Sequence, residues 1–302
     1  MRLLKSNNTN DIDLAILGLG YESRAISKCQ RLVNIKTNII AIGYDNHTDE
    51  LQYQNNLEYY NSIGATIIEG KDSHIYRELF NLVREKWAGI KINCIIDITV
   101  MSRTRLAEII IFLADNLEEG STIKVSYSLA EYTEPSSNIS PIRKVGPIAD
   151  SLSGALGDIN LPSSIIIGLG YEVGKAIGIS NYLDTEKQFI FMPKGKDESF
   201  EKSVRENNQL LIENTPQNHI FNYDISNPYK TYLDLRETTL AIMDISRPVL
   251  VPLGPKIFSA LCVILSLEMN RKLPIWRVSS EHLEEPVDRK ASGDFFEFTL
   301  VI

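Results

Sequence analysis

A polar segment that follows an apolar run carries the residues best suited to chemistry. It reads Asp97-x-Thr99-x-x-Ser102-Arg103, and the pattern of the next residues predicts an amphipathic helix over 104–116. Thr99 and Ser102 offer hydroxyls, Arg103 offers a planar cation, and Asp97 offers an acceptor for a ribose hydroxyl or an amide. The N–H groups and the dipole at the start of a helix favour anions. The segment therefore predicts a site for a phosphate-bearing ligand, while an N-capped helix after a core strand, with Arg103 on the surface, is the alternative that needs no ligand.

A glycine-containing turn occurs twice in the chain. Gly18-Leu-Gly-Tyr-Glu22 and Gly168-Leu-Gly-Tyr-Glu172 each follow an apolar run, and they lie 150 residues apart. Glycines between a strand and a helix allow the backbone to approach a ligand closely, although a tight turn without a ligand is the alternative for each copy. Ser23 stands where a dinucleotide-binding motif has its third glycine, so no dinucleotide cofactor is expected. The turns contribute Gly18, Gly20, Tyr21, Glu22, Gly168, Gly170, Tyr171 and Glu172 to the predicted site.

A cation also recurs after the fourth expected strand of each half. Pro252-Leu-Gly254-Pro-Lys256 takes the place of the Asp97 segment, and Lys256 follows Arg103 by 153 residues. The aspartate and threonine are not repeated, so the two half-sites would differ chemically. Gly254 and Lys256 complete the predicted ligand-binding set, and an exposed lysine in a first helical turn is the alternative.

Strands and helices must alternate to place these segments. The apolar runs predict strands at 13–17, 38–42, 65–69, 93–98 and 122–128, and again at 165–168, 187–192, 219–223, 248–253 and 274–278. Helical periodicity separates most of them, which is typical of parallel sheets built by right-handed crossovers. We therefore expect an α/β protein with two tandem Rossmann-like units, related by a pseudo-two-fold axis through internal duplication.

The expected boundaries follow from composition. Residues 1–135 form the first unit, the Ser-, Pro- and Gly-rich stretch 136–162 forms a connection, and residues 163–302 form the second unit. Polar and apolar residues alternate over 295–301, which predicts a C-terminal edge strand or hairpin in the second unit.

Composition excludes several classes of protein. The net charge of −8 argues against broad, non-specific DNA binding, which requires a basic surface. No apolar run approaches the ~20 residues of a membrane span, and the N-terminal residues do not resemble a signal peptide. Cys29, Cys94 and Cys262 are widely spaced, as expected for buried thiols in a reducing compartment, so we expect a cytoplasmic protein. The four histidines are scattered, and neither a P-loop nor Gly-x-Ser-x-Gly occurs; no metal and no cofactor are expected.

The segment from Asp97 to Arg103, at the end of a fourth Rossmann strand, resembles the Asp/Asn-x-Ser/Thr-x-x-x-Arg/Lys motif of CARF domains, the sensors of CRISPR-associated proteins. Two such units in one chain resemble the SAVED domains of related antiviral systems. The resemblance implies binding of a cyclic oligonucleotide across a two-fold interface. It places ligand contacts on Gly18, Gly20, Thr99, Ser102, Arg103, Gly168, Gly170 and Lys256.

The sequence thus favours a sensor that binds a phosphate-rich, nucleotide-like ligand in a cleft between two Rossmann-like halves, in bacterial antiviral defence, with a separate effector protein as partner. An enzyme acting on a nucleotide or phosphosugar, including a ring-nuclease-like phosphodiesterase that uses Lys256, Arg103, Ser102 and Ser259, is the second hypothesis. A scaffold subunit of a defence complex is the third. Because no activated nucleophile or base is evident in the sequence, the catalytic residues stay unknown and we expect binding without turnover.

Overall fold

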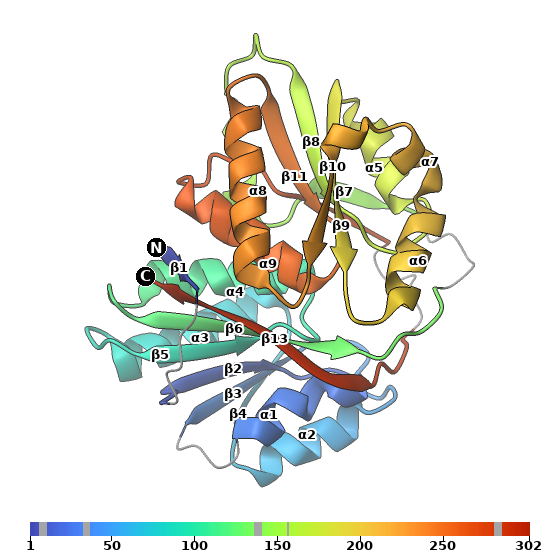
Figure 1. The fold of residues 1–302 in the computed structure, drawn as a ribbon. Helices are drawn as coiled ribbons and strands as arrows, with labels where there is room; N and C mark the ends of the chain where they lie inside the picture. The colour runs from blue at the N-terminus through green and yellow to red at the C-terminus, as the bar shows by residue number, and fades with distance from the viewer. Residues whose placement is uncertain (6–10, 33–36, 136–140, 156, 281–285) are drawn as a thin grey trace. The chain divides into compact units, whose positions relative to one another are not determined.

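The computed structural model describes residues 1–5, 11–32, 37–135, 141–155, 157–280 and 286–302. The chain divides into two compact units (Figure 1). Unit 1 comprises Met1–Glu131 together with Pro286–Ile302, and unit 2 comprises Tyr132–Glu285. Unit 2 is therefore an insertion, in chain order, between two segments of unit 1.

Unit 1 is built on a seven-stranded sheet. Its strands are β1 (Arg2–Leu4), β2 (Leu14–Gly18), β3 (Asn38–Gly43), β4 (Thr66–Glu69), β5 (Asn93–Asp97), β6 (Thr122–Ala130) and β13 (Ala291–Val301). Its helices are η1 (Ser23–Ile26), α1 (Ser27–Leu32), α2 (Tyr53–Ser62), α3 (Asp72–Trp87) and α4 (Arg103–Asn116). The order is β1-β13-β6-β5-β2-β3-β4, in which β6, β5, β2, β3 and β4 run parallel. This arrangement is Rossmann-like, with one strand order reversal between β2 and β5.

The apolar composition of the central strands accounts for the layers of unit 1. Every residue of β2 is buried, because helices cover both faces of a parallel sheet and leave no face for water. Side chains of β2, β3 and β5 pack against α1 and α2, with Cys29 and Tyr60 among the buried contacts. Helices α3 and α4 cover the other face (Figure 1).

Unit 2 is built on a four-stranded parallel sheet. The strands of the parallel sheet are β8 (Ser163–Gly168), β9 (Lys187–Lys194), β10 (Ile220–Asp224) and β11 (Arg247–Pro252). The unit also contains β7 (Lys144–Pro147) and β12 (Trp276–Ser279). Its helices are η2 (Asp150–Leu152), α5 (Lys175–Leu183), α6 (Glu198–Asn207), α7 (Gln209–Glu213), η3 (Gln217–His219), α8 (Pro228–Met243) and α9 (Lys256–Glu268). The parallel order is β10-β9-β8-β11, and β12 pairs with β7 in a separate antiparallel pair. A parallel bridge from Leu250 to Ile275 aligns the chain entering β12 with β11.

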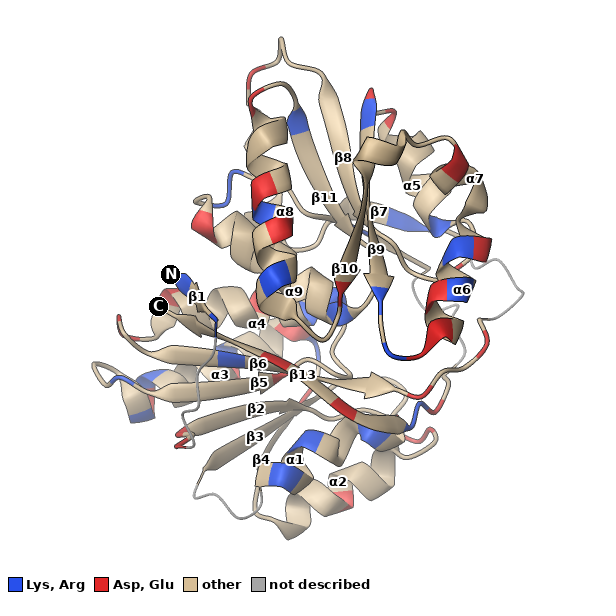
Figure 2. Cartoon of the chain, viewed as in Figure 1, with Lys and Arg blue, Asp and Glu red and all other residues tan. Residues whose placement is uncertain are grey.

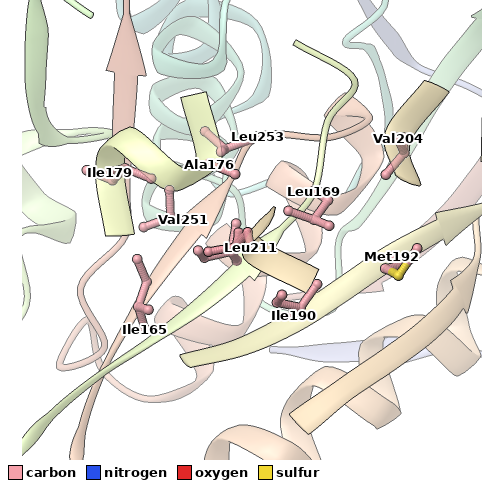
Figure 3. Close-up of a cluster of buried hydrophobic side chains, with 11 residues drawn as sticks. Ile165, Leu169, Ala176, Ile179, Ile190, Met192, Val204, Leu211, Val251 and Leu253 are labelled. Atoms are coloured by element: carbon pink, nitrogen blue, oxygen red, sulfur yellow. The ribbon is translucent and has the colours of Figure 1, made fainter. Parts of the chain in front are cut away.

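The core of unit 2 lies on the face of the sheet covered by α5, α6 and α7 (Figure 3). Ile165 and Ile190 come from neighbouring strands, and Ala176 and Ile179 come from α5, at the spacing that puts two residues on one side of a helix. Val204 and Leu211 close the cluster from α6 and α7. Helix α6 carries both acidic and basic residues (Figure 2), and Glu201 pairs with Arg205 on it.

The C-terminal strand differs from its predicted place. Strand β13 pairs antiparallel with β6 of unit 1, so the last residues do not extend the second unit, and β13 is not an edge because β1 pairs with its other side. Burial of Phe296, Phe298 and Leu300 explains this position, since the alternation that suggested an edge strand supplies an apolar face to the sheet of unit 1. The expected connection 136–162 also carries structure, in β7 and η2, and groups with unit 2.

No helix of the described residues is both long and apolar enough to cross a membrane. The cysteines Cys29, Cys94 and Cys262 are free and buried.

Candidate functional site

In unit 1 the predicted segments meet at the carboxyl ends of β2 and β5, the point where the strand order reverses. A Cβ built on Gly18 would lie 2.6 Å from Cγ2 of Val100, and one on Gly20 would lie 3.3 Å from Cβ of Val100. The glycine turn therefore packs directly on the loop between β5 and α4. Both glycines are buried, and their first role is to admit the Val100 side chain.

A buried asparagine fixes the same turn from the second helix. Asn56 of α2 donates from Nδ2 to the carbonyl oxygens of Gly20 and Glu22, at 2.8 and 3.0 Å. The Tyr60 hydroxyl donates to the Gly18 carbonyl at 3.3 Å. These bonds satisfy carbonyl groups that the turn leaves outside the sheet, so its backbone conformation is held by α2.

Asp97, the last residue of β5, and Thr99 both serve the fold. Asp97 is 1% exposed and Thr99 is fully buried. The Thr99 hydroxyl donates to Oδ1 of Asp97 at 2.5 Å and accepts the backbone N–H of Ser128 at 2.9 Å. Burial raises the pKa of Asp97 to about 6, against hydrogen bonds from Thr99 and the charges of Lys28 and Arg24, which lower it. The pair thus joins the end of β5 to β6.

Ser102 and Arg103 stand at the start of α4, as predicted. Ser102 is the N-cap residue, and its hydroxyl accepts the backbone N–H of Arg105 at 3.1 Å. The Ser102 backbone N–H donates to the Tyr44 hydroxyl at 2.8 Å. Arg103 is the first residue of α4 and is partly buried. Ser102 therefore caps α4, and it remains exposed beside the glycine turn.

Arg105 is a buried cation that the sequence analysis did not identify. Its Nε donates to Oδ1 of Asp72 at 2.6 Å, and its terminal nitrogens donate to the carbonyls of Gly43 and Gly70 at 2.9 and 3.1 Å. Its guanidinium carbon lies 3.4 Å from the centroid of the Tyr44 ring. All of these contacts lie at the carboxyl ends of β3 and β4, so Arg105 fixes the loops next to Ser102.

Glu22, the acidic residue of the glycine turn in unit 1, forms an ion pair with Arg24. Oε2 of Glu22 lies 2.6 Å from Nε of Arg24, which is 1% exposed. Arg24 also donates to the Ser128 carbonyl at 2.8 Å. Tyr21 contacts His47 edge to face, with ring centroids 5.9 Å apart. Glu22 therefore positions a buried arginine, and the partly exposed side chains of the turn are those of Tyr21 and Glu22.

In unit 2 the turn and the loop after the fourth strand again lie in contact. A Cβ on Gly168 would lie 2.4 Å from the ring of Phe258, and one on Gly254 would lie 2.3 Å from the Leu169 carbonyl oxygen. The backbone N–H groups of Leu253 and Gly254 both donate to the Gly168 carbonyl, at 2.8 and 2.9 Å. A Cβ on Gly170 would lie 2.6 Å from the Leu253 carbonyl oxygen. The glycines of the second copy are thus required by close packing.

An asparagine fixes this second turn in the same manner. Nδ2 of Asn208 lies 2.8 Å from the Gly170 carbonyl oxygen, and Nδ2 of Asn207 lies 2.5 Å from that of Tyr171. Asn208 follows Asn56 by 152 residues, close to the 150-residue repeat of the turns. Comparison of the two halves at this offset would have paired Asn56 with Asn208 from the sequence.

The remaining predicted residues of unit 2 lie around the start of α9. Lys256 is the first residue of α9, as Arg103 is of α4. Tyr171 and Glu172 are partly buried, and the Tyr171 ring lies 6.0 Å from that of Phe200. Ser259 is fully buried within α9, so it is not presented to a ligand.

Each unit thus brings together its own glycine turn and its own cation. The residues left accessible are Tyr21, Glu22, Ser102 and Arg103 in unit 1, and Tyr171, Glu172 and Lys256 in unit 2. Gly18, Gly20, Asp97, Thr99, Gly168, Gly170 and Gly254 are buried. Within the described ranges, no three His, Cys, Asp or Glu side chains are grouped so that they could hold a metal ion.

Comparison with known proteins gives no family and no relative. No family profile matches the chain, and no characterised protein matches it significantly. Among solved structures, the chain is similar to the cytoplasmic domain of a prokaryotic cation chloride cotransporter, with a TM-score of 0.25 and 9% sequence identity over 90% of this chain and 97% of the other.

Proposed function

We propose that this protein binds a phosphate-bearing, nucleotide-like ligand at the carboxyl ends of its parallel strands and acts as a sensor. One observation carries the proposal. In each unit the helix after the fourth parallel strand begins with a cation, Arg103 in α4 and Lys256 in α9, and the loop that leads into this helix packs on the glycine turn. Ligands of open α/β sheets lie where the strand order reverses, and the start of a helix favours anions.

The Arg103 end offers more than a charge. The exposed Ser102 hydroxyl and the partly exposed Tyr21 ring flank the glycine turn. A hydroxyl can bond a phosphate or a ribose, and an aromatic ring can stack on a base. Because Arg105 and Asn56 fix the neighbouring loops, these groups are preorganised, which reduces the entropy that binding costs.

We further propose that the two units arose by duplication of one Rossmann-like unit. The shared chain order of the parallel strands supports this origin, as do the two Gly-Leu-Gly-Tyr-Glu turns. The hydrogen bonds from Asn56 to Gly20 and from Asn208 to Gly170 add a correspondence outside those turns. A duplicated origin favours one kind of ligand for both units.

The resemblance to CARF and SAVED domains extends the proposal to a cyclic oligonucleotide as ligand, to antiviral defence as context, and to a separate effector protein as partner. A sensor needs only a difference in affinity between two conformations. The enzyme alternative has less support, because the Ser102 hydroxyl caps α4 and Ser259 is enclosed in α9. We therefore propose binding without turnover.

The test compares Arg103→Ala and Lys256→Ala with the unmodified chain in calorimetric titrations with mononucleotides, cyclic dinucleotides and cyclic oligoadenylates. A charge-assisted hydrogen bond contributes about 1.5–3 kcal/mol, so each substitution should weaken binding by about ten- to a hundredfold. The stoichiometry distinguishes one ligand per unit from one ligand per chain. Mass spectrometry of the recovered ligand measures turnover.

Arg77→Ala is the matched control, because Arg77 is an arginine of α3 with a side chain 69% exposed, outside the glycine turn and outside α4. Its affinity should equal that of the unmodified chain. Equal affinities in the unmodified chain and in all three variants, with intact folding, would show that Arg103 and Lys256 do not bind the ligand and would reject the proposal. Repeated cleavage that is lost on Lys256→Ala would instead establish an enzyme.

A further inference from the structure

A hollow in unit 2, away from the glycine turns, is lined by cations and an aromatic ring. Its volume is about 420 Å³, within the range of ~300–1,000 Å³ that is typical of small-molecule sites. The residues that line it are Ile142, Arg143, Lys144, Val145, Gly178 and Tyr182. They come from β7, the residues just before it, and the outer face of α5.

The walls of the hollow are anchored on both sides. Arg143 donates its backbone N–H to the Ser279 carbonyl at 3.0 Å, and Val145 pairs with Val278 in the β7–β12 pair. On the other side, α5 buries Ala176 and Ile179 in the core of unit 2 (Figure 3). A neighbouring face of the same helix carries Gly178 and Tyr182 one turn apart, and these two residues line the hollow.

Gly178 explains how the walls come close. A Cβ at this position would lie 2.8 Å from Cδ1 of Ile142, so the glycine admits the Ile142 side chain against the helix. A glycine inside a helix destabilises the helix relative to alanine. The close approach of Ile142 to α5 therefore depends on a glycine that lowers the stability of the helix.

The charged residues that line the hollow are all basic. Arg143 and Lys144 are exposed, and neither forms an ion pair with a carboxylate among the described residues. The described lining contains no acidic residue, although the whole chain has a net charge of −8. Tyr182 is 64% exposed and makes no ring contact within the described ranges, so packing does not account for it.

We infer that this hollow is a second binding site, for a phosphate-bearing aromatic molecule the size of a mononucleotide. The phosphate lies on Arg143 and Lys144, where an arginine can bond two phosphate oxygens at once. The base stacks on the Tyr182 ring, since every base offers a flat face to an aromatic side chain. This site does not depend on the function proposed for the glycine turns.

The test uses the full chain carrying Arg103→Ala and Lys256→Ala, so that the outcome is separate from that of the first proposal. Adenosine 5′-monophosphate and pyrophosphate are titrated calorimetrically into this protein and into versions with added changes. Arg143→Ala with Lys144→Ala should weaken binding of both probes by tenfold or more. Tyr182→Ala should weaken the mononucleotide about tenfold and leave pyrophosphate unchanged, whereas Tyr182→Phe should retain both affinities.

Lys202→Ala with Arg205→Ala is the matched control, because it removes two exposed cations of unit 2 that pair with glutamates on α6. It should change neither affinity. Absence of binding at millimolar ligand, or equal losses in the control and in the Arg143 and Lys144 variant, would overturn the assignment. A short single-stranded RNA that binds far more tightly than the mononucleotide, with steep salt dependence, would overturn it in favour of a nucleic-acid surface.

Discussion

The hydroxyl of Thr99 lies 2.5 Å from Oδ1 of Asp97, and both residues are buried where β5 ends. The same hydroxyl accepts the Ser128 backbone N–H, so its hydrogen-bonding capacity is directed to the protein. The two residues that resembled a ligand-binding motif therefore act as a joint between neighbouring strands. Burial of the Asp97 carboxyl also makes unit 1 sensitive to pH.

Asp97→Asn should remove this sensitivity. Burial raises the pKa of Asp97 from 3.8 to about 6, so the folded chain holds the proton more tightly than the unfolded chain. The stability from this group is fully present below pH 4 and is lost as the pH rises to 6. At 1.36 kcal/mol per pKa unit, the loss is about 3 kcal/mol.

Denaturant unfolding of both proteins between pH 4.5 and 7.5 measures the difference. The free energy of unfolding of Asp97→Asn, relative to the unmodified chain, should grow with pH and level off above 6. The substitution keeps the acceptor for Thr99, because an amide oxygen replaces Oδ1. Asp197→Asn, a change at an exposed helix cap, is the control. A difference in free energy that does not vary with pH would contradict the assignment.

Gly18→Ala should destabilise unit 1 by overpacking. The added Cβ would lie 2.6 Å from Cγ2 of Val100, and overpacking of a dense interior costs about 1–3 kcal/mol. Val100→Ala in the same chain should recover most of the loss, which a double-mutant cycle of unfolding free energies detects. Gly146→Ala, where no atom lies within 4 Å of the added Cβ, is the matched control and should stay within about 0.5 kcal/mol. Additive effects of the two substitutions would argue against the predicted contact.

Asn56→Ala and Asn208→Ala should have similar effects in their respective units. Each removes a buried donor from the second glycine carbonyl of a turn, and an unsatisfied buried group costs about 1–3 kcal/mol. Hydrogen exchange should show faster opening of residues 18–22 in the first variant and 168–172 in the second. Asn55→Ala, on the exposed side of α2, should leave both turns protected. Loss of protection in the opposite unit would show that the two asparagines do not act locally.

Arg105→Lys should destabilise the protein strongly although the charge is kept. Lysine cannot reproduce three directed hydrogen bonds from one planar group to Asp72, Gly43 and Gly70. The hydrogen bonds to the Gly43 and Gly70 carbonyls would be weakened or lost, and an unsatisfied buried group costs about 1–3 kcal/mol. Thermal unfolding should show a large drop for this variant and little change for Arg77→Lys on the surface of α3. Equal unfolding temperatures would mean that Arg105 contributes no more than a surface arginine.

The strands and the glycine turns could be predicted because they depend on local pattern. The apolar run Leu14–Leu17 is buried on both sides, and such a run is typical of a central parallel strand. Ser102 was predictable as a helix cap because capping is a property of the neighbouring backbone.

The contacts that decide the role of each polar residue are long-range, and local pattern does not contain them. Arg105 meets Gly43 across 62 residues and Asp72 across 33, so the sequence does not distinguish it from Arg103, two positions earlier. The residues around Glu297 do not indicate its partner either, yet its carboxylate lies 2.5 Å from Nζ of Lys28, 269 residues away. Burial alone would raise the pKa of Glu297, but the charge and hydrogen bond of Lys28 outweigh it and the pKa lies below its ordinary value. The placement of β13 depends on this kind of contact.

The return of β13 to unit 1 has a consequence for biosynthesis. A ribosome completes β6 long before it reaches residue 291, so during translation of the whole of unit 2 the outer edge of β6 has no strand beside it. Unpaired edges are templates for aggregation. Unit 2, whose strands are continuous in the chain, can therefore complete its sheet before unit 1 although it is made second.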